Sequence, residues 1–381
     1  MALPSGSQQI QTLDVKIAGG NHFGRYPKIS VEQTFNMIVS DGTLVDYAGY
    51  KNILTINAGG KGRGAYASSV LNIILCVVGR GVYVIESDLE TFRQVGTLFT
   101  SDGQVYIAEN NNDQIVITDG IKLYVYDASP DGAQTPPATE FMTSGIDFQF
   151  PTTGGSIDYQ NPGYISFQNG RFILSLNNTS IWVLSGYNTA NANNSWPADS
   201  SHIGTLQTKP DFVQAALPFP GKGNTLFVMG KDCIESWVDV GAAKFPYQKN
   251  SSFNIDYGTI NPTSLSHLEN FIVFLSINEQ SGLAIMLSEG GSIQTISTDG
   301  IDFKLGGLTN PEDCNGFLFR QDGHLLYQFT FITDNLSYVY DFTTKEFFTV
   351  TDEDLNYHPA RDVIFFNNKY YFVSLNDGNL Y

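Results

Sequence analysis

Two short apolar stretches joined by an Asp-Gly turn are the feature of this sequence that most constrains its fold. Residues 114–118 and 122–127 are rich in β-branched and aromatic side chains, such as Ile115 and Val125, and such side chains favour strands. Gly120 supplies the positive φ that a tight reversal requires. A single hairpin buries too little apolar surface to be stable alone in water, so the fold depends on whether this motif recurs.

The hairpin motif recurs along the whole chain. First strands are predicted to begin near residues 73, 114, 171, 225, 271, 325 and 369. Successive units are therefore roughly 40–60 residues long, close to the length of a propeller blade. Further strand patterns precede several hairpins, at residues 104–109, 163–167, 211–217 and 361–366. Four antiparallel strands per unit is the pattern of a β-propeller. We therefore predict an all-β protein, a β-propeller of six or seven four-stranded antiparallel blades.

Both ends of the propeller region carry strand patterns without an obvious partner. Residues 28–56 alternate like strands and turn at Asp41-Gly42, whereas the seventh hairpin stops at Tyr381. A closed ring removes exposed sheet edges, so we predict that the N-terminal strands and the last unit close the ring together. This divides the chain into a polar N-terminal arm (residues 1–27) and a propeller (residues 28–381). Because the chain stops within the seventh hairpin, we also expect the native gene product to continue beyond Tyr381.

The charge of the chain excludes one class of function. The 381 residues include 38 Asp plus Glu and 20 Lys plus Arg, which gives a net charge of −18. A protein that grips nucleic acid needs Lys and Arg on the phosphates. Two interpretations of the acidity stay open. It confers solubility, or it forms a repulsive wall along which DNA slides without sticking.

The cysteines and the apolar runs bear on the cellular compartment. Cys76, Cys233 and Cys314 are widely spaced, lie in or beside apolar strand patterns, and form no CxxC or Cys/His ligand spacing. We predict reduced, buried thiols, which fit folding in a cytosol. The start of the chain has no secretory signal pattern. The longest apolar runs, at 73–78 and 271–275, are much shorter than the roughly 20 residues of a membrane-spanning helix.

No motif in the sequence commits the chain to catalysis, a metal or a cofactor, and we predict that it is not an enzyme. The five histidines stand in separate loops without metal-ligand spacing. Residues 59–64 (GGKGRG) lack the context of a phosphate-binding loop and are interpreted as a basic turn. The run Asp352, Glu353, Asp354 is interpreted as a solvated loop between blades. Paired carboxylates can meet in space without a sequence signature.

Two rival functions therefore stay open. The first is a carbohydrate-binding or glycoside-hydrolysing propeller, whose signature would be an axial pocket lined by two carboxylates and by stacked Trp or Tyr. The second is a cellular protein-interaction propeller, which would be monomeric.

Candidate partner contacts lie in the arm and in one polar loop. Those in the arm are His22, Phe23, Arg25 and Tyr26, because terminal arms often order only on a partner. Those in the loop at residues 187–203 are Tyr187 and Trp196. Trp196 is either an anchor for a partner or a lid packed on its own blade.

Three stretches of the sequence resemble a known family. Residues 28–50, with Asn36-Met37 followed by a turn, are similar to the N-terminal region of packaged-DNA stabilisation proteins. The sequence LVDYAGYKNIL at residues 44–54 is part of this similarity. These are the tail hub, or nozzle, proteins of short-tailed bacteriophages. The family usually has Pro-Gly where Ala48-Gly49 stands here. Further similarity lies at residues 232–248 and 259–298, and the likeness extends from Lys28 to the end.

The resemblance implies a structural virion protein. It implies a propeller followed by a further β-rich domain, which we expect to lie beyond this chain. Copies of the protein would form a ring, expected to be a hexamer, under the portal–adaptor complex. That ring would help to retain packaged DNA, form the DNA exit conduit and hold the tail needle and tailspikes. Double-stranded DNA would pass nearby without specific binding. The location implied is the virion tail, after synthesis and assembly in the bacterial host cytoplasm.

The resemblance also sharpens two expectations. The arm (residues 1–26) would dock on a neighbouring adaptor subunit, and the carboxylates would concentrate on the channel side. Within the same context, the carbohydrate-binding alternative would be a receptor-binding tail protein.

Overall fold

The computed structural model describes residues 35–56, 59–128, 141–142, 149–152, 155–158, 161–190, 196, 201–219, 221–243, 245–278, 282–289 and 292–381. In this part of the chain, helical structure is confined to α1 (Asp299–Leu305) and the short 3-10 turns η2 (Pro262–Ser264) and η3 (Pro311–Asp313). No helix among these residues is both long and apolar enough to cross a membrane. The rest consists of strands and loops, as predicted.

Six sheets of four antiparallel strands follow one another along the described chain. The first contains β3 (Gly62–Ser68), β4 (Ile73–Val78), β5 (Gly81–Ile85) and β6 (Phe92–Thr97). The second contains β7 (Tyr106–Glu109), β8 (Gln114–Thr118), β9 (Leu123–Asp127) and β10 (Phe141–Met142). The third contains β13 (Pro162–Gln168), β14 (Arg171–Leu176), β15 (Ile181–Leu184) and β16 (Ile203–Thr205). The fourth contains β17 (Ala215–Pro218), β18 (Thr225–Met229), β19 (Ile234–Asp239) and β20 (Tyr247–Ile255). The fifth contains β21 (Ser266–Leu268), β22 (Phe271–Asn278), β23 (Gly282–Glu289) and β24 (Ser292–Thr295). The sixth contains β25 (Cys314–Gln321), β26 (His324–Phe331), β27 (Leu336–Asp341) and β28 (Glu346–Thr349).

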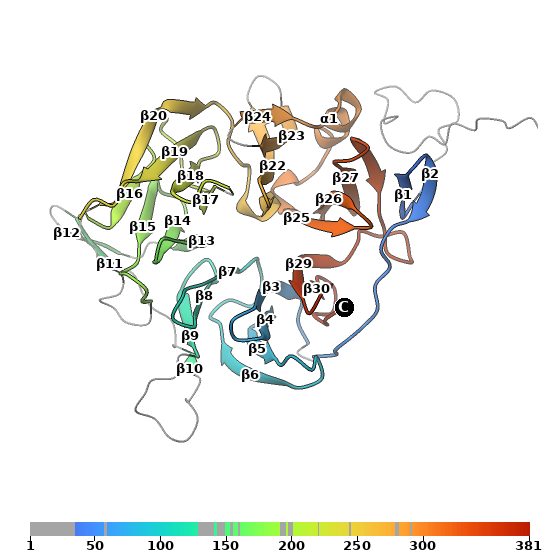
Figure 1. Cartoon of the computed structure of the whole chain (residues 1–381), viewed down its shortest axis with the longest axis horizontal. Coiled ribbons are helices and arrows are strands. Elements are labelled where there is room, and N and C mark those ends of the chain that lie inside the picture. Colours follow the sequence, from blue (N-terminus) through green and yellow to red (C-terminus); the bar gives the residue numbers. More distant parts are fainter. Residues whose placement is uncertain are drawn as a thin grey trace, which may run out of the picture.

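Three two-stranded sheets complete the described strands. They are β1 (Met37–Ser40) with β2 (Thr43–Asp46), β11 (Gln149–Thr152) with β12 (Gly155–Asp158), and β29 (Ala360–Phe366) with β30 (Lys369–Ser374). The last pair is the seventh sheet of the ring. The colours in Figure 1 run around the ring from β3 to the β29–β30 pair, which lies beside β3.

The middle strands of each sheet are mostly apolar and buried because neighbouring sheets cover both of their faces. β4 (IILCVV), β9 (LYVYD) and β26 (HLLYQFTF) are buried at every position. A strand with one solvated face would alternate apolar and polar side chains, and these strands do not. The outer strands differ: β6 and β24 are partly exposed and polar.

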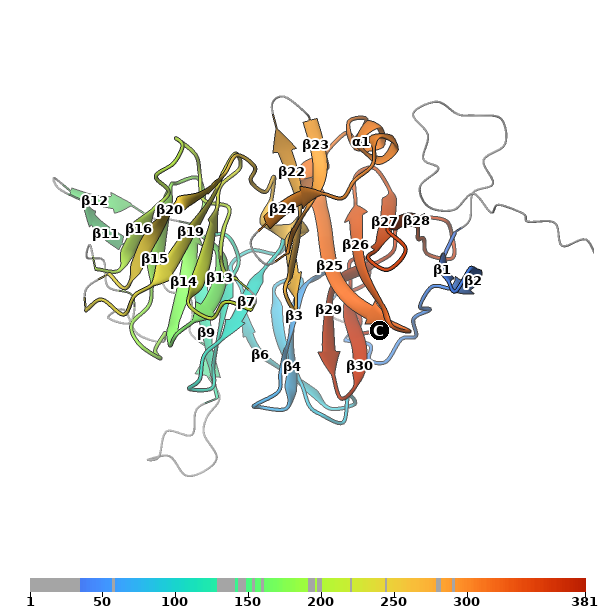
Figure 2. The same cartoon turned by 45° about the horizontal axis from the view of Figure 1, so that its top comes forward.

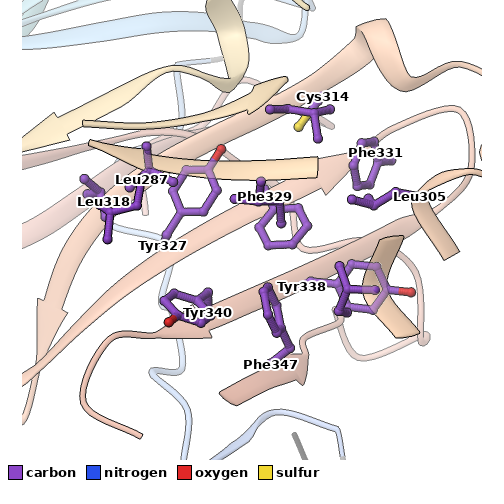
Figure 3. Packing of buried hydrophobic residues seen from close by; sticks show 14 of the residues in the cluster. Leu287, Leu305, Cys314, Leu318, Tyr327, Phe329, Phe331, Tyr338, Tyr340 and Phe347 are labelled. Carbon is purple, nitrogen blue, oxygen red and sulfur yellow. The ribbon is translucent and has the colours of Figure 1, made fainter. Parts of the chain in front are cut away.

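Seven hydrophobic clusters show that the ring is closed. Each cluster lies between two consecutive sheets. In the cluster between the fifth and sixth sheets, the Phe329 ring contacts those of Tyr327, Phe331 and Phe347 (Figure 3). The cluster that closes the circle packs Ile74 and Cys76 of the first sheet against Ile364 and Val373 of the seventh. The predicted propeller of six or seven four-stranded antiparallel blades is therefore confirmed, with six four-stranded sheets and a smaller seventh.

Both ends of the described chain build the seventh sheet. Leu380 forms antiparallel bridges with Val373 on one side and with Leu54 on the other. Leu54 N donates to Leu380 O over 3.2 Å, and Leu380 N donates to Leu54 O over 2.9 Å. We call these strand pairings the seam. Ring closure by N-terminal and C-terminal segments together is thus confirmed, although the N-terminal contribution is residues 53–56.

The N-terminal hairpin itself lies outside the ring. The predicted Asp41-Gly42 turn joins β1 to β2, with positive φ at both positions. Phe35 forms a parallel bridge with Thr349 beside β28, and buried Ile38 packs against Val339 of the sixth sheet. Figure 2 shows the hairpin on the outer side of the ring, away from β3.

One sequence interpretation is wrong. Residues 59–64 are not simply a basic turn, because β3 begins at Gly62. A Cβ on Gly62 would lie 2.6 Å from Ser374 O, so glycine allows β3 to approach β30 closely. Arg63 is then drawn into the interior and is only 2% exposed.

Candidate functional site: the seam groove

Residues 47–53 cross the seventh sheet as a strap between the hairpin and the seam, and Tyr50 is the centre of its contacts. The Tyr50 ring stands edge-on to three aromatic rings, with centroid distances of 5.1 Å to His358, 5.3 Å to Phe372 and 5.5 Å to Tyr381. Phe372 and Tyr381 stack on each other at 5.4 Å. Edge-to-face contacts of this kind add to the effect of apolar burial. The strap is therefore fixed by packing, while 40% of Tyr50 remains exposed.

Two cavities meet at this strap, and we call them together the seam groove. The first has a volume of about 210 Å³ and is mostly aromatic and apolar, with walls from Phe317, Phe319 and Tyr370. The second is about 560 Å³ and opens toward an acidic rim. Both are lined by residues 47–50, His358 and Tyr381. An aromatic floor beside a polar rim is the usual anatomy of a protein-binding surface.

The acidic rim carries Asp352, Glu353, Asp354 and Asp377. The first three form the loop between β28 and β29, where Glu353 and Asp354 are exposed, as the sequence predicted. Asp352 Oδ1 accepts from Asp354 N and Asn356 N at 2.9 and 2.8 Å, so this carboxylate shapes its own loop. Burial, followed by the nearby Asp352 charge, raises the pKa of the Tyr50 hydroxyl, so the phenol stays protonated at the rim.

The floor of the aromatic cavity contains an unpaired donor. Gln328 is fully buried, its Oε1 accepts from the Tyr47 hydroxyl, and its Nε2 has no hydrogen-bonding partner within the described part of the chain. Burial also lowers the pKa of His358 to about 4, so its ring is neutral at pH 7 and Nδ1 accepts from Ala360 N over 3.3 Å. The floor of the groove is therefore aromatic and neutral, with one unpaired amide donor buried beneath it.

A second constellation lies beside the hairpin. His324 Nδ1 is 2.7 Å from Asp341 Oδ2, and His324 Nε2 is 3.0 Å from Ser40 Oγ. This order of groups matches that of a Ser-His-Asp triad. Ser40 and His324, however, line neither cavity of the seam groove. We interpret Ser40, His324 and Asp341 as a structural hydrogen-bond network that fixes the β1–β2 turn to the sixth sheet.

The structure places the predicted contact residues as follows. His22, Phe23, Arg25 and Tyr26 lie outside the described residues. Tyr187 is 69% exposed, and its ring covers Gly170. Trp196 is 6% exposed, stacks on Phe172 at 6.4 Å, and donates from Nε1 to Ala190 O over 3.1 Å. In the isolated chain Trp196 is thus a lid on its own sheet, and a contact with a partner stays a prediction for all six residues.

The remaining sequence candidates are also located. Cys76, Cys233 and Cys314 are free and buried, and burial raises the pKa of Cys76 to about 12, so these thiols are protonated and inert. His267 and His324 lie in strands and not in loops. Among the described residues, no group of three or more His, Cys, Asp or Glu side chains is arranged to hold a metal ion.

Sequence reasoning missed the strap and the floor of the seam groove. Tyr50, His358 and Tyr381 are far apart in the chain, and nothing in their local sequence signals that they meet. The only usable signal was the unpaired strand pattern at both ends of the chain.

Comparisons with known proteins agree with this fold. The model of the family described as "Bacteriophage P22 Gp10, beta-propeller" matches residues 16–381. No curated protein matches the chain.

Solved structures resemble the chain in fold alone. The extracellular domain of a hybrid two-component system from B. thetaiotaomicron aligns with a TM-score of 0.52 at 12% identity, over 88% of this chain and 39% of that one. A one-component system domain from the same organism aligns with a TM-score of 0.50 at 11% identity, over 87% of this chain and 39% of that one. This chain therefore spans about two fifths of those proteins. The WD40 propeller domain of Doa1 aligns at 12% identity over 88% of this chain and 96% of that one, with a TM-score of 0.47.

Proposed function

The chain belongs to the family of the bacteriophage P22 Gp10 β-propeller, a family of structural phage proteins, and from this premise we propose that it is a subunit of the tail hub, or nozzle. In this role it sits below the portal–adaptor complex, helps to retain packaged DNA and forms part of the DNA exit conduit. The observation that carries the proposal is the family match over residues 16–381. The proposed partners are further copies of the chain in a hexameric ring, the adaptor, and the tail needle or tailspikes.

The seam groove supports a role in assembly. It combines exposed aromatic side chains at Tyr50 and Tyr370 with an acidic rim. Residue 35, the first described residue after the arm, lies beside the same sheets. We propose that the arm docks on a neighbouring adaptor subunit and that the groove receives a protein segment with an apolar side chain and a basic flank. Aromatic anchors in desolvated pockets supply most of the binding free energy at such contacts.

The acidity supports a conduit. The segments that lead into the first strand of each following sheet carry exposed carboxylates, among them Asp102, Asp256, Asp299 of α1, Glu312 of η3 and Glu353. We call this side of the ring the entry face. A dense negative field repels the phosphate backbone at short range and keeps DNA from adhering. We propose that the entry face borders the channel through which DNA passes.

Co-assembly tests the proposal. The full chain is mixed with the portal–adaptor complex of its phage, followed by light scattering and electron cryo-microscopy. We expect a ring of chains below the adaptor, with the entry face toward the bore. The variant Tyr50→Ala, Tyr370→Ala should assemble more weakly, because each truncation removes an aromatic anchor.

Phe212→Ala is the matched control, since Phe212 is also an exposed aromatic residue but lies between the third and fourth sheets. It should assemble like the natural chain. A chain that does not join the adaptor complex, or a ring whose bore is neutral or basic, would refute the tail hub assignment.

A further inference from the structure

A cavity of about 300 Å³ lies at the mouth of the ring axis on the entry face. Its walls come from the segments that start the inner strands: residues 61–63 at β3, 102–104 before β7, Asn261 and Thr263 before β21, Glu312 and Asp313 before β25, and Arg361 in β29. Tyr357 adds an aromatic ring to one wall. Five sheets of the ring therefore contribute to one pocket.

Hydrogen bonds between neighbouring sheets connect these segments at the N-terminal ends of the strands. Val105 N donates to Arg63 O over 3.3 Å, which joins the second sheet to the first. Asn315 Nδ2 donates to Arg361 O over 2.6 Å, which joins the sixth to the seventh. The cavity is thus built on strand ends and not on long loops, so its shape is fixed by the ring.

Three buried polar atoms of residues in this wall have no hydrogen-bonding partner among the described residues. They are Arg361 Nε, Asp313 Oδ1 and Gln104 Oε1. Arg361 is only 7% exposed. A buried donor or acceptor that is left without a partner costs on the order of 1–3 kcal/mol, and more when it is charged. Such atoms require an explanation, and here all three belong to residues that line the same cavity.

Arg63 shows that the ring is able to satisfy a buried guanidinium at this mouth. Arg63 is 2% exposed and donates to four carbonyls and one hydroxyl, at Gly79, Thr100, Asp102 and Gly103. Arg361, by contrast, forms no such set of bonds and lies on the cavity wall. Burial lowers the pKa of Arg361, while the nearby charge of Asp362 raises it. Arg361 therefore keeps an unsatisfied donor beside the cavity.

The chemistry of the wall indicates the kind of ligand. Lys61, Arg63 and Arg361 are balanced by Asp102, Glu312 and Asp313, so a phosphate or another highly charged ion would meet as much repulsion as attraction. The unpaired atoms require an acceptor for Arg361 and donors for Asp313 and Gln104. A sugar hydroxyl is both donor and acceptor, and the apolar face of a sugar ring can lie on Tyr357. The volume is at the small end of ligand pockets.

We propose that the axial cavity binds one sugar unit of a carbohydrate. Arg361 donates to a ring or hydroxyl oxygen, and Asp313 and Gln104 accept from hydroxyl groups. The site has part of the signature that the sequence analysis set for a carbohydrate-binding propeller, because carboxylates and one Tyr line an axial cavity. Sugar binding is a function beyond the proposed assembly role. An experiment that disproves sugar binding would leave the assembly role unchanged.

Saturation-transfer difference NMR on the full chain tests this site. D-glucose, D-galactose, D-mannose, L-rhamnose and N-acetyl-D-glucosamine are titrated separately as probes. We expect saturable transfer to at least one of them. Arg361→Met and Asp313→Asn should each raise its dissociation constant about tenfold or more, since each removes a charge-assisted hydrogen bond.

Arg320→Met is the matched control. Arg320 is an exposed arginine at the other end of β25, paired with Glu269 at 2.7 Å, and its loss should leave sugar binding unchanged. Circular dichroism checks that each variant is folded. If Arg361→Met does not fold, the nearly isosteric Asp313→Asn and Gln104→Glu carry the test. Absence of transfer from all five sugars, which is the result of a cavity filled by water only, would overturn the proposal. Binding that these variants leave unchanged would also overturn it.

Discussion

The sixth and seventh sheets lie side by side in the ring but are built in opposite ways. All four strands of the sixth sheet come from one continuous segment, from Cys314 to Thr349. The seventh sheet takes β29 and β30 from one end of the chain and residues 53–56 from the other, and Ile56 and Asn379, which bond at 3.1 Å, are 323 residues apart. Local pairing needs little loop closure, whereas the seam requires the whole ring to be in place. We expect the seam to form last.

The two sheets also differ in burial. β26 is buried at every position, whereas β30 begins with exposed residues and β29 has Phe365 on its surface. Local opening concentrates where few apolar contacts are buried. The comparison therefore shows that the sheet that closes the ring is less buried than its neighbour, and that the seam groove lies on it.

Leucine truncation gives the largest expected effect. Leu380 in the seam and Leu326 in β26 are both fully buried. Changing either to Ala should lower the free energy of unfolding by about 2–5 kcal/mol. Only Leu380→Ala should speed amide exchange selectively in β30 and residues 53–56, measured by hydrogen exchange and mass spectrometry. Equal acceleration in β26 would show that seam and sixth sheet open as one unit.

Acid should weaken the seam next most strongly. The folded-state pKa of His358 is lowered to about 4 because its ring is buried, against about 6.5 in an unfolded chain. The unfolded chain therefore takes up the proton first, so stability is complete above pH 6.5 and is lost as the pH falls toward 4. The loss should amount to about 3 kcal/mol.

His358→Asn is the control for this titration, because the amide oxygen can replace Nδ1 as the acceptor from Ala360 N. Urea unfolding at pH 7 and pH 4 should show a smaller loss for the variant than for the natural chain. The same pH dependence in both proteins would assign the acid effect to other groups.

Removing one hydroxyl from the strap should have the smallest effect. Tyr47→Phe leaves buried Gln328 Oε1 without its donor, at a cost of about 1–3 kcal/mol. Tyr340→Phe in the sixth sheet is the matched change, because the Tyr340 ring is buried and its hydroxyl has no hydrogen-bonding partner among the described residues. It should change stability by less than about 0.5 kcal/mol. Thermal unfolding compares the two, and similar losses would contradict a special role for the strap.

The sequence predicted the hairpins well because their signals are local. Turns such as Asp119-Gly120 and apolar runs such as Ile73–Val78 lie within a few residues of each other, and β4, β8 and β30 begin and end where they were expected. The outer strands were missed because they are short and polar: β24 reads SIQT and is mostly exposed. The helix α1 was also missed, since its seven residues are too few to show a helical period.

The sites were less predictable than the fold. The seam groove and the axial cavity join side chains from distant segments, and neither Arg361 nor Tyr50 carries a local signal of its neighbours. Burial of Arg63 depends on carbonyls from two other loops, the β4–β5 turn and the loop between β6 and β7, which no local pattern reveals. Only the ring geometry brings these groups together.

The antiparallel pairing of Leu54 with Leu380 also determines how the subunit bears a mechanical load. In this pair the upstream end of residues 53–56 and the end at Tyr381 lie on the same side, as the 2.8 Å bond from Ile53 N to Leu380 O shows. Tension applied to the chain at these two points peels the strands apart bond by bond and does not stretch all bonds together. Forced opening is governed by the rate at which the first of these bonds breaks. We therefore expect the seam to open at a lower force than the six complete sheets.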